Sequence, residues 1–164
     1  MKGCFTILSG AVVGAISIVA VLVLVSERVP DVFEVPPQVI RASINELEGD
    51  IEWVEPNRAL VAFDEHLMMS IRVVATADGQ SVDSIEMWYD DLSIKQASQI
   101  IGDLSSSVRS SQSKSEVVRE AMNWLPQRHA EGDYERIGVV FIDVISESDE
   151  HGNTFVKLTR QPRF

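Results

Sequence analysis

Cysteine is nearly absent from this chain of 164 residues, since Cys4 is the only one. A disulfide framework is therefore excluded, and the composition suits a bacterial periplasm or a reducing cytosol better than a small secreted module. Positive charge is also scarce, because 14 Lys and Arg stand against 25 Asp and Glu, for a net charge of -11. Proteins that bind DNA or RNA carry clustered Lys and Arg, so we expect no nucleic-acid partner.

Histidine is the next shortage, with His66, His129 and His151 as its three positions. None of them has the four-residue spacing of a helical zinc site, and no cysteine follows position 4 to complete a ligand set. The acidic loop Glu147–Gly152 imitates a calcium loop, but the position that requires a glutamate falls on Leu158. The sequence therefore predicts no metal site and no cofactor.

Motifs of known catalytic sites are missing as well. The chain has no Gly-x-Ser-x-Gly elbow, no His-Glu-x-x-His helix and no phosphate-binding Gly-x-x-x-x-Gly-Lys loop. Ser111 and Lys114 match Ser-x-x-Lys, but the Lys-Thr-Gly strand that accompanies this pair in acyl-transfer enzymes is absent. Asp90 and Asp91 precede a predicted helix start, where acidic residues are favourable. We therefore predict no catalytic residue and no enzymatic activity.

Charge is absent altogether from Phe5–Val25, a run of 21 residues after the short tail 1–4. A helix of this length spans about 30 Å, the thickness of the hydrocarbon core of a bilayer. A cleaved signal peptide has a shorter apolar region, so we predict an uncleaved single-pass membrane anchor. Lys2 before the run favours a bacterial inner-membrane protein with a cytoplasmic N-terminus and a periplasmic domain.

Gly10 and Gly14 lie four residues apart within this apolar run. Small residues at that spacing let two helices approach closely in lipid, although glycine is also common in membrane helices generally. The spacing predicts helix–helix contact, and with it a homo- or heterodimer formed through the anchor.

Prolines dominate the next segment, Ser26–Gln38, at positions 30, 36 and 37. Proline opposes both helix continuation and pairing within a central strand, so we predict an extended tether over residues 26–38. The domain proper is then expected at 39–160, followed by a short tail at 161–164. The first residues of that domain, 39–47, fit a strand and a short helix equally well.

Alternation of apolar and polar residues predicts an antiparallel meander in the first half of the domain. The four expected strands are Ile51–Val54, Ala59–Phe63, Leu67–Ala77 and Ser81–Tyr89. Between the last two, a three-residue loop at Asp78–Gln80 pairs Ile71 with Met87 and keeps both on one apolar face. A two-residue loop would mix the two faces, so we expect the longer loop, with Gly79 in the left-handed conformation.

Two capping boxes, Ser93–Gln96 and Ser113–Glu116, predict the starts of two helices. Their apolar seams are expected to cover the sheet rather than to form a groove for a partner. The seams comprise Ile94, Ala97, Ile101, Leu104 and Val108 in the first helix, and Val117, Val118, Ala121, Met122 and Leu125 in the second. The second half of the first helix is rich in serine, a mediocre helix former, and is expected to fray.

The remaining elements are two strands that form a C-terminal β-hairpin. Ile137–Ile145 is nearly all apolar, which indicates a central strand, and Thr154–Thr159 places Val156 and Leu158 on one face. The predicted fold class is therefore α+β: an N-terminal transmembrane helix, an antiparallel meander, a pair of amphipathic helices and the C-terminal hairpin.

The function predicted from these elements is that of a membrane-anchored, non-enzymatic accessory protein whose acidic periplasmic domain binds a protein partner in a membrane complex. The alternative is a small-ligand sensor, or a co-regulator of a membrane-bound receptor or transcription regulator, with an apolar pocket between sheet and helices. Candidate contact residues are Met69, Met87 and Ile101 for the pocket, and Trp88. We expect Trp88 beneath the helical pair; an exposed Trp88 would instead indicate a contact surface.

Overall fold

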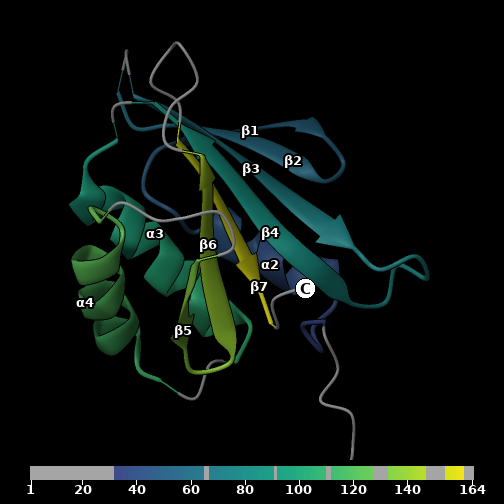
Figure 1. Ribbon diagram of the computed structural model, residues 1–164. Helices are drawn as coiled ribbons and strands as arrows, with labels where there is room; N and C mark the ends of the chain where they lie inside the picture. Colours follow the sequence, from purple (N-terminus) through teal and green to yellow (C-terminus); the bar gives the residue numbers. More distant parts are fainter. Residues whose placement is uncertain are drawn as a thin grey trace, which may run out of the picture.

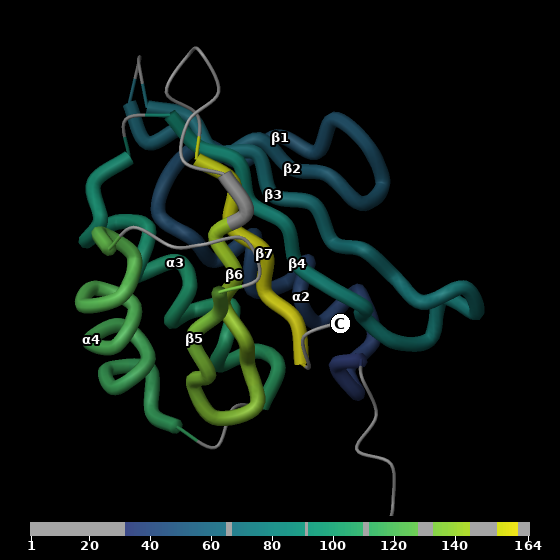
Figure 2. The backbone as a smooth tube through the Cα atoms, in the orientation of Figure 1, coloured from purple at the N-terminus to yellow at the C-terminus, as the bar shows by residue number. Residues whose placement is uncertain are grey.

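The computed structural model describes residues 32–64, 67–90, 92–109, 112–127, 133–146 and 154–160. They form an α+β fold in which one antiparallel sheet of seven strands packs against helices (Figure 1). The strands follow the order β1-β2-β3-β4-β7-β6-β5. Figure 2 traces how the last strand of the chain, β7, enters between β4 and β6. The α+β class and the antiparallel sheet agree with the prediction.

The helices and strands are short, from 4 residues in β5 to 14 residues in α3. The strands are β1 (Asp50–Glu55), β2 (Arg58–Ala62), β3 (Met68–Ala75), β4 (Val82–Tyr89), β5 (Tyr134–Ile137), β6 (Val140–Ser146) and β7 (Thr154–Thr159). The helices are α2 (Pro37–Ile44), α3 (Ile94–Ser107) and α4 (Lys114–Trp124). Helices α2 and α3 lie behind the sheet in Figure 1, and α4 packs on α3 and contacts β5.

The pairing of β3 with β4 confirms the predicted register. Ile71 lies opposite Met87, and both side chains are buried against the helices. The turn itself is longer than expected, because the pairing shifts by one residue at a bulge between Val74 and Ala75. The last backbone hydrogen bond before the turn therefore joins the Thr76 N–H to the Ser81 carbonyl. Gly79 has a φ of 70°, which is the left-handed conformation predicted for it.

Hydrogen bonds to Asp78 hold this turn. Its Oδ1 accepts from the Thr76 hydroxyl at 2.6 Å and from the Gln80 N–H at 3.1 Å. These donors stabilise the ionised carboxylate and lower its pKa, the hydroxyl most strongly. The turn is therefore closed by its own side chains.

The single central strand predicted at Ile137–Ile145 is wrong in one respect, because it is two strands. Gly138 has a φ of 62°, and the chain turns there between β5 and β6. Glycine tolerates this conformation, so the turn fits inside an apolar run that contains no proline. Strand β6 does lie inside the sheet, whereas the short β5 forms its edge.

The packed domain begins earlier than the predicted boundary at Val39. Phe33 exchanges backbone hydrogen bonds with Val82, and its side chain is only 1% exposed. Val35 is buried as well, and α2 starts at Pro37, the first helical position, where proline is favourable. The part of the predicted tether that the structure describes, 32–38, therefore belongs to the domain. Of residues 39–47, which fitted a strand or a short helix, 39–44 are helical and 45–47 form the turn that follows.

Both predicted helix starts are confirmed. The Ser93 hydroxyl accepts from the Gln96 N–H at 3.2 Å, and the Glu116 carboxylate accepts from the Ser113 N–H at 2.9 Å. The predicted fraying of α3 is wrong, since the helix continues to Ser107. Its small residues explain this continuity: Ser98, Gly102 and Ser105 are all buried on the helix, and Gly102 lies against Val118 of α4, so the helix is held by close packing.

The core is a single apolar cluster between the covered face of the sheet and the helices. It includes the predicted face of β3 and β4 and both predicted residues of β7, Val156 and Leu158. In α4, Val117 and Ala121 are buried as expected, but Met122 is 42% exposed. Part of the apolar seam of α4 therefore faces solvent instead of the core.

Candidate functional site

The face of the sheet that points away from the helices is here called the open face. On the central strands β2, β3, β4 and β7 its side chains include Arg58, Leu60, Ser70, Arg72, Glu86, Trp88, Phe155 and Lys157. None of these eight is fully buried, whereas Ala59, Ile71, Met87 and Val156 on the covered face are. Antiparallel sheets often have one solvated face, and alternation along each strand produces that division here.

An apolar row crosses the open face. Leu60 lies opposite Ser70, Ser70 opposite Trp88, and Trp88 opposite Phe155. The rings of Trp88 and Phe155 are 4.8 Å apart between centroids and tilted by 35°. The expected burial of Trp88 beneath the helical pair is therefore wrong, because the helices cover the face that carries Met87. Two partly buried aromatic rings on a solvated face are the feature expected of a contact surface.

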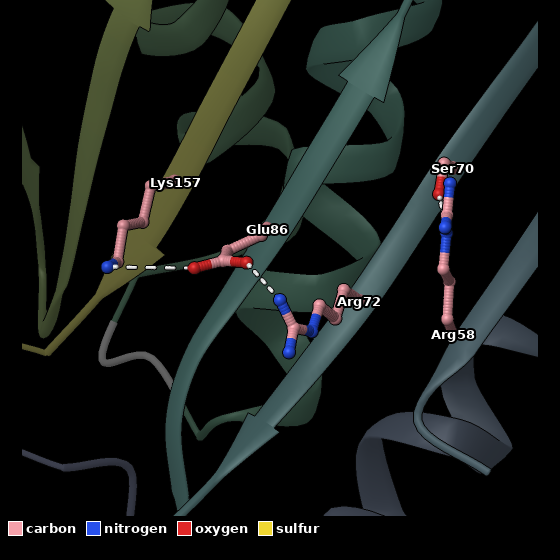
Figure 3. A network of polar contacts seen from close by, with 5 residues as sticks. All are labelled: Arg58, Ser70, Arg72, Glu86 and Lys157. Carbon is pink, nitrogen blue, oxygen red and sulfur yellow. Dashed lines mark hydrogen bonds and ion pairs between the residues drawn. The ribbon is translucent and has the colours of Figure 1, made fainter. Parts of the chain in front are cut away.

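A charged row runs beside the apolar row, two residues further along each strand and therefore about 7 Å away. Its centre is Glu86, whose side chain is 15% exposed and lies between Arg72 at 3.8 Å and Lys157 at 3.7 Å (Figure 3). Both distances exceed those of a direct hydrogen bond. One carboxylate is thus shared by two cations from neighbouring strands.

Arg58 is the exception in this row. It pairs in register with Arg72, a like-charge arrangement that is unfavourable across two strands. Its Nε donates to the Ser70 hydroxyl at 2.9 Å, which turns the guanidinium away from Arg72 and toward the apolar row (Figure 3). Among the described residues Arg58 forms no ion pair. Arg58 is an exposed residue, and the hydrogen bond to Ser70 restricts its side chain.

Two clefts lie on the helical side of the molecule. One, of about 650 Å³, has an apolar floor of Leu47, Phe63 and Ile100, with Lys95 and Lys114 among its polar walls. Lys114 forms an ion pair with Asp103 there. The other, of about 680 Å³, is a more open groove along α4 that contains the exposed Met122. The two adjoin at Gln99 and Lys114, which line both.

The candidate contact residues from the sequence are divided by the fold. Met69 and Met87 are 1% exposed and Ile101 is fully buried, so these three side chains pack in the core and line neither cleft. Trp88 alone of the candidates reaches a surface. Arg58 was missed by the sequence analysis, and the signal for it was the register: the same pairing that joins β2 to β3 places two arginines side by side.

Several predicted features lie outside the described residues. They are the apolar run Phe5–Val25 with Gly10 and Gly14, all three histidines, Asp91, Ser111 and the acidic loop Glu147–Gly152. Within the described ranges no helix is long and apolar enough to cross a membrane. No three His, Cys, Asp or Glu gather to form a metal site among these described residues.

No protein-family model, no curated protein and no solved structure matches this chain.

Proposed function

We propose that this chain is a membrane-anchored, non-enzymatic accessory protein whose domain binds a protein partner through the open face of its sheet. The observation that carries the proposal is the contact between the tilted rings of Trp88 and Phe155 on a face that no described helix covers. Solvent-accessible aromatic rings beside charged side chains are typical of protein contact surfaces, where the rings supply apolar area and arginine supplies directed hydrogen bonds.

We also propose the membrane anchor and the orientation that the sequence predicts. Phe5–Val25 serves as the single membrane span, with the N-terminus in the bacterial cytoplasm and the domain in the periplasm. Gly10 and Gly14 support a dimer through this span. A C-terminal alkaline phosphatase fusion, which is active only in the periplasm, tests the orientation; activity of a cytoplasmic reporter at the same position would reverse it.

Photo-crosslinking in native membranes tests the contact surface. Two methionines of similar exposure make a matched pair: Met68, 48% exposed beside the open face, and Met122, 42% exposed on α4. With a photoreactive residue at each position in turn, we expect one adduct of defined mass from Met68 and not from Met122. Trp88→Ala should lower the yield of that adduct. The same adduct from both positions, or from Met122 alone, would contradict binding through the open face.

A second candidate function is a small-ligand sensor, and the cleft of about 650 Å³ favours it. Its volume falls within the range of ligand sites, and its apolar floor is ringed by polar groups. Thermal unfolding in a panel of amino acids, sugars and short-chain acids tests this alternative. A ligand that raises Tm in the wild type but not after Ile100→Trp, which would fill the floor, would support the sensor.

A further inference from the structure

Arg58 has a role that the open face as a whole does not explain. We propose that its guanidinium binds a carboxylate of the protein partner, so that the partner's docking segment is acidic and carries an apolar side chain next to the acid. This inference rests on the proposed function and names the chemistry of the partner at the same surface.

The charges along the row that contains Arg58 favour a carboxylate at that position. In register order the row reads Glu55, Arg58, Arg72, Glu86, Lys157 and Asp143. Charges alternate along it except at Arg58 and Arg72, the one place where two cations are neighbours. Glu86 already interacts with Arg72 and Lys157. An added carboxylate is therefore favoured at the arginine pair and opposed by the acidic residues elsewhere along the row.

Ser70 holds the Arg58 side chain before any partner binds. Arg58 is an exposed residue whose hydrogen bond to Ser70 uses Nε, and no ion pair with a described residue occupies its terminal nitrogens. A guanidinium held in place with its terminal donors exposed suits two parallel hydrogen bonds to one carboxylate. Because Ser70 has already restricted the side chain, binding costs less conformational entropy than it would for a mobile arginine.

Arg58 lies close to the aromatic rings. Ser70, which holds the guanidinium, lies directly opposite Trp88, and the Trp88 ring contacts Phe155. A partner segment that reaches both the rings and Arg58 must therefore carry an apolar side chain and an acidic one next to each other on the same face. Residues i and i+2 of a strand, or i and i+4 of a helix, are placed in this way.

Arg58→Gln and Arg72→Gln test the inference as a matched pair of exposed cross-strand arginines. In full-length protein in native membranes, we expect Arg58→Gln to lower the yield of the Met68 photo-adduct at least tenfold. Arg72→Gln should change it less than about threefold, since that arginine interacts with Glu86. Equal losses in both variants would reduce the effect to general charge attraction and overturn the specific role of Arg58.

A zero-length crosslink tests the carboxylate directly. Arg58→Lys places a primary amine on the same strand position, and a water-soluble carbodiimide joins an amine only to a carboxylate that touches it. We expect an adduct with the mass of the Met68 photo-adduct from Arg58→Lys, above the background that Lys157 gives in the wild type, and none above background from Arg72→Lys. An undiminished photo-adduct in Arg58→Gln, without a carbodiimide adduct in Arg58→Lys, would overturn the inference and leave the proposed function standing.

Failure of the proposed function has a different signature. In that case Met68 gives no defined adduct in any variant, wild type included. Lipid phosphate is the other anionic group that the guanidinium could bind. If a photoreactive residue at Met68 of the full-length protein, in vesicles of phosphatidylcholine with phosphatidylglycerol, labels lipid and loses that labelling in Arg58→Gln, the guanidinium recognises lipid phosphate, and the assignment of a protein carboxylate is overturned.

Discussion

Gly102 sets how closely α3 and α4 approach each other. A Cβ atom added there would lie 2.6 Å from Cγ2 of Val118 and 3.3 Å from Cγ of Lys114. Alanine normally stabilises a helix relative to glycine by about 0.5–1 kcal/mol, but overpacking costs about 1–3 kcal/mol, so the clash should win. We predict that Gly102→Ala lowers the free energy of unfolding of residues 26–164 in urea.

The side chain of Val118 provides the control for this prediction. Val118→Ala removes the atom that the new Cβ would meet, so Gly102→Ala should be neutral or stabilising in that background. Additive losses in the double variant would show that the glycine matters through something other than the helix contact.

Tyr89 makes the stability of the domain sensitive to alkaline pH. Burial on the covered face raises the pKa of its phenol to about 12, whereas in the unfolded chain it returns to about 10. The folded state then holds the proton more tightly, so stability is complete below pH 10 and falls as pH rises toward 12, by about 1 kcal/mol at pH 11. We predict that urea unfolding of Tyr89→Phe loses this part of the decline between pH 9 and 11. Identical declines in both proteins would count against it.

Alternation along the strands carries much of the residue-scale information. It predicted correctly that Ile71 faces Met87, because a slip of one residue would turn every apolar side chain to solvent. The same alternation places Trp88 and Glu86 on one face of the sheet and Met87 on the other. The error was to expect the helices on the face that carries Trp88. The role proposed for Arg58 could not be predicted from alternation, because it depends on the cross-strand neighbour Arg72 and on the hydrogen bond to Ser70.

At the scale of an element, Ser93 and Ser106 have different roles at the two ends of α3. Ser93 caps the helix with its hydroxyl, whereas Ser106 is exposed in the last turns and donates to the carbonyl of Gly102 at 2.8 Å. We predict that Ser93→Ala costs about 1 kcal/mol of stability, while Ser106→Ala is neutral or slightly stabilising because alanine is the better helix former. Urea denaturation of both variants, followed by circular dichroism, checks the contrast; equal losses would remove the capping role.

Two elements show why local signals were insufficient. Pro36 and Pro37 indicated an extended segment, yet proline also suits the first turn of a helix, and only the burial of Ile40 and Ile44 against the sheet decides between them. Gly138 is a single glycine between apolar residues, so nothing in its neighbourhood distinguishes a turn from a strand interior. In both cases tertiary packing selects between conformations that the local sequence permits.

At the scale of the whole molecule, the residues before α2 hold the domain together. Phe33 is 1% exposed and Val35 is 3% exposed, although both precede the predicted domain boundary. Removing a buried phenylalanine costs about 3–5 kcal/mol. We predict that a chain starting at residue 38 melts well below one starting at residue 26, and that Phe33→Ala in the longer chain reproduces most of the loss. Equal Tm values for the two lengths would show that the segment is only a tether.

The candidate site depends on the whole molecule more than any element does. Composition and periodicity predicted the α+β class and the antiparallel sheet, but not that β7 enters between β4 and β6. That insertion brings Phe155 beside Trp88 and Lys157 beside Glu86. The surface thus joins residues that are far apart in sequence, and no local pattern could have brought them together.

The pairing of Phe33 with Val82 also limits how far the domain travels. With the proposed anchor ending at Val25, the chain from there to Val32 extends at most about 25 Å. Because this connecting segment is so short, a partner in the same membrane meets the open face at an effective concentration of the order of millimolar. Weak contacts then suffice for occupancy, and a partner that diffuses freely in solution has no such advantage. The short connection therefore favours partners in the same membrane over partners in solution.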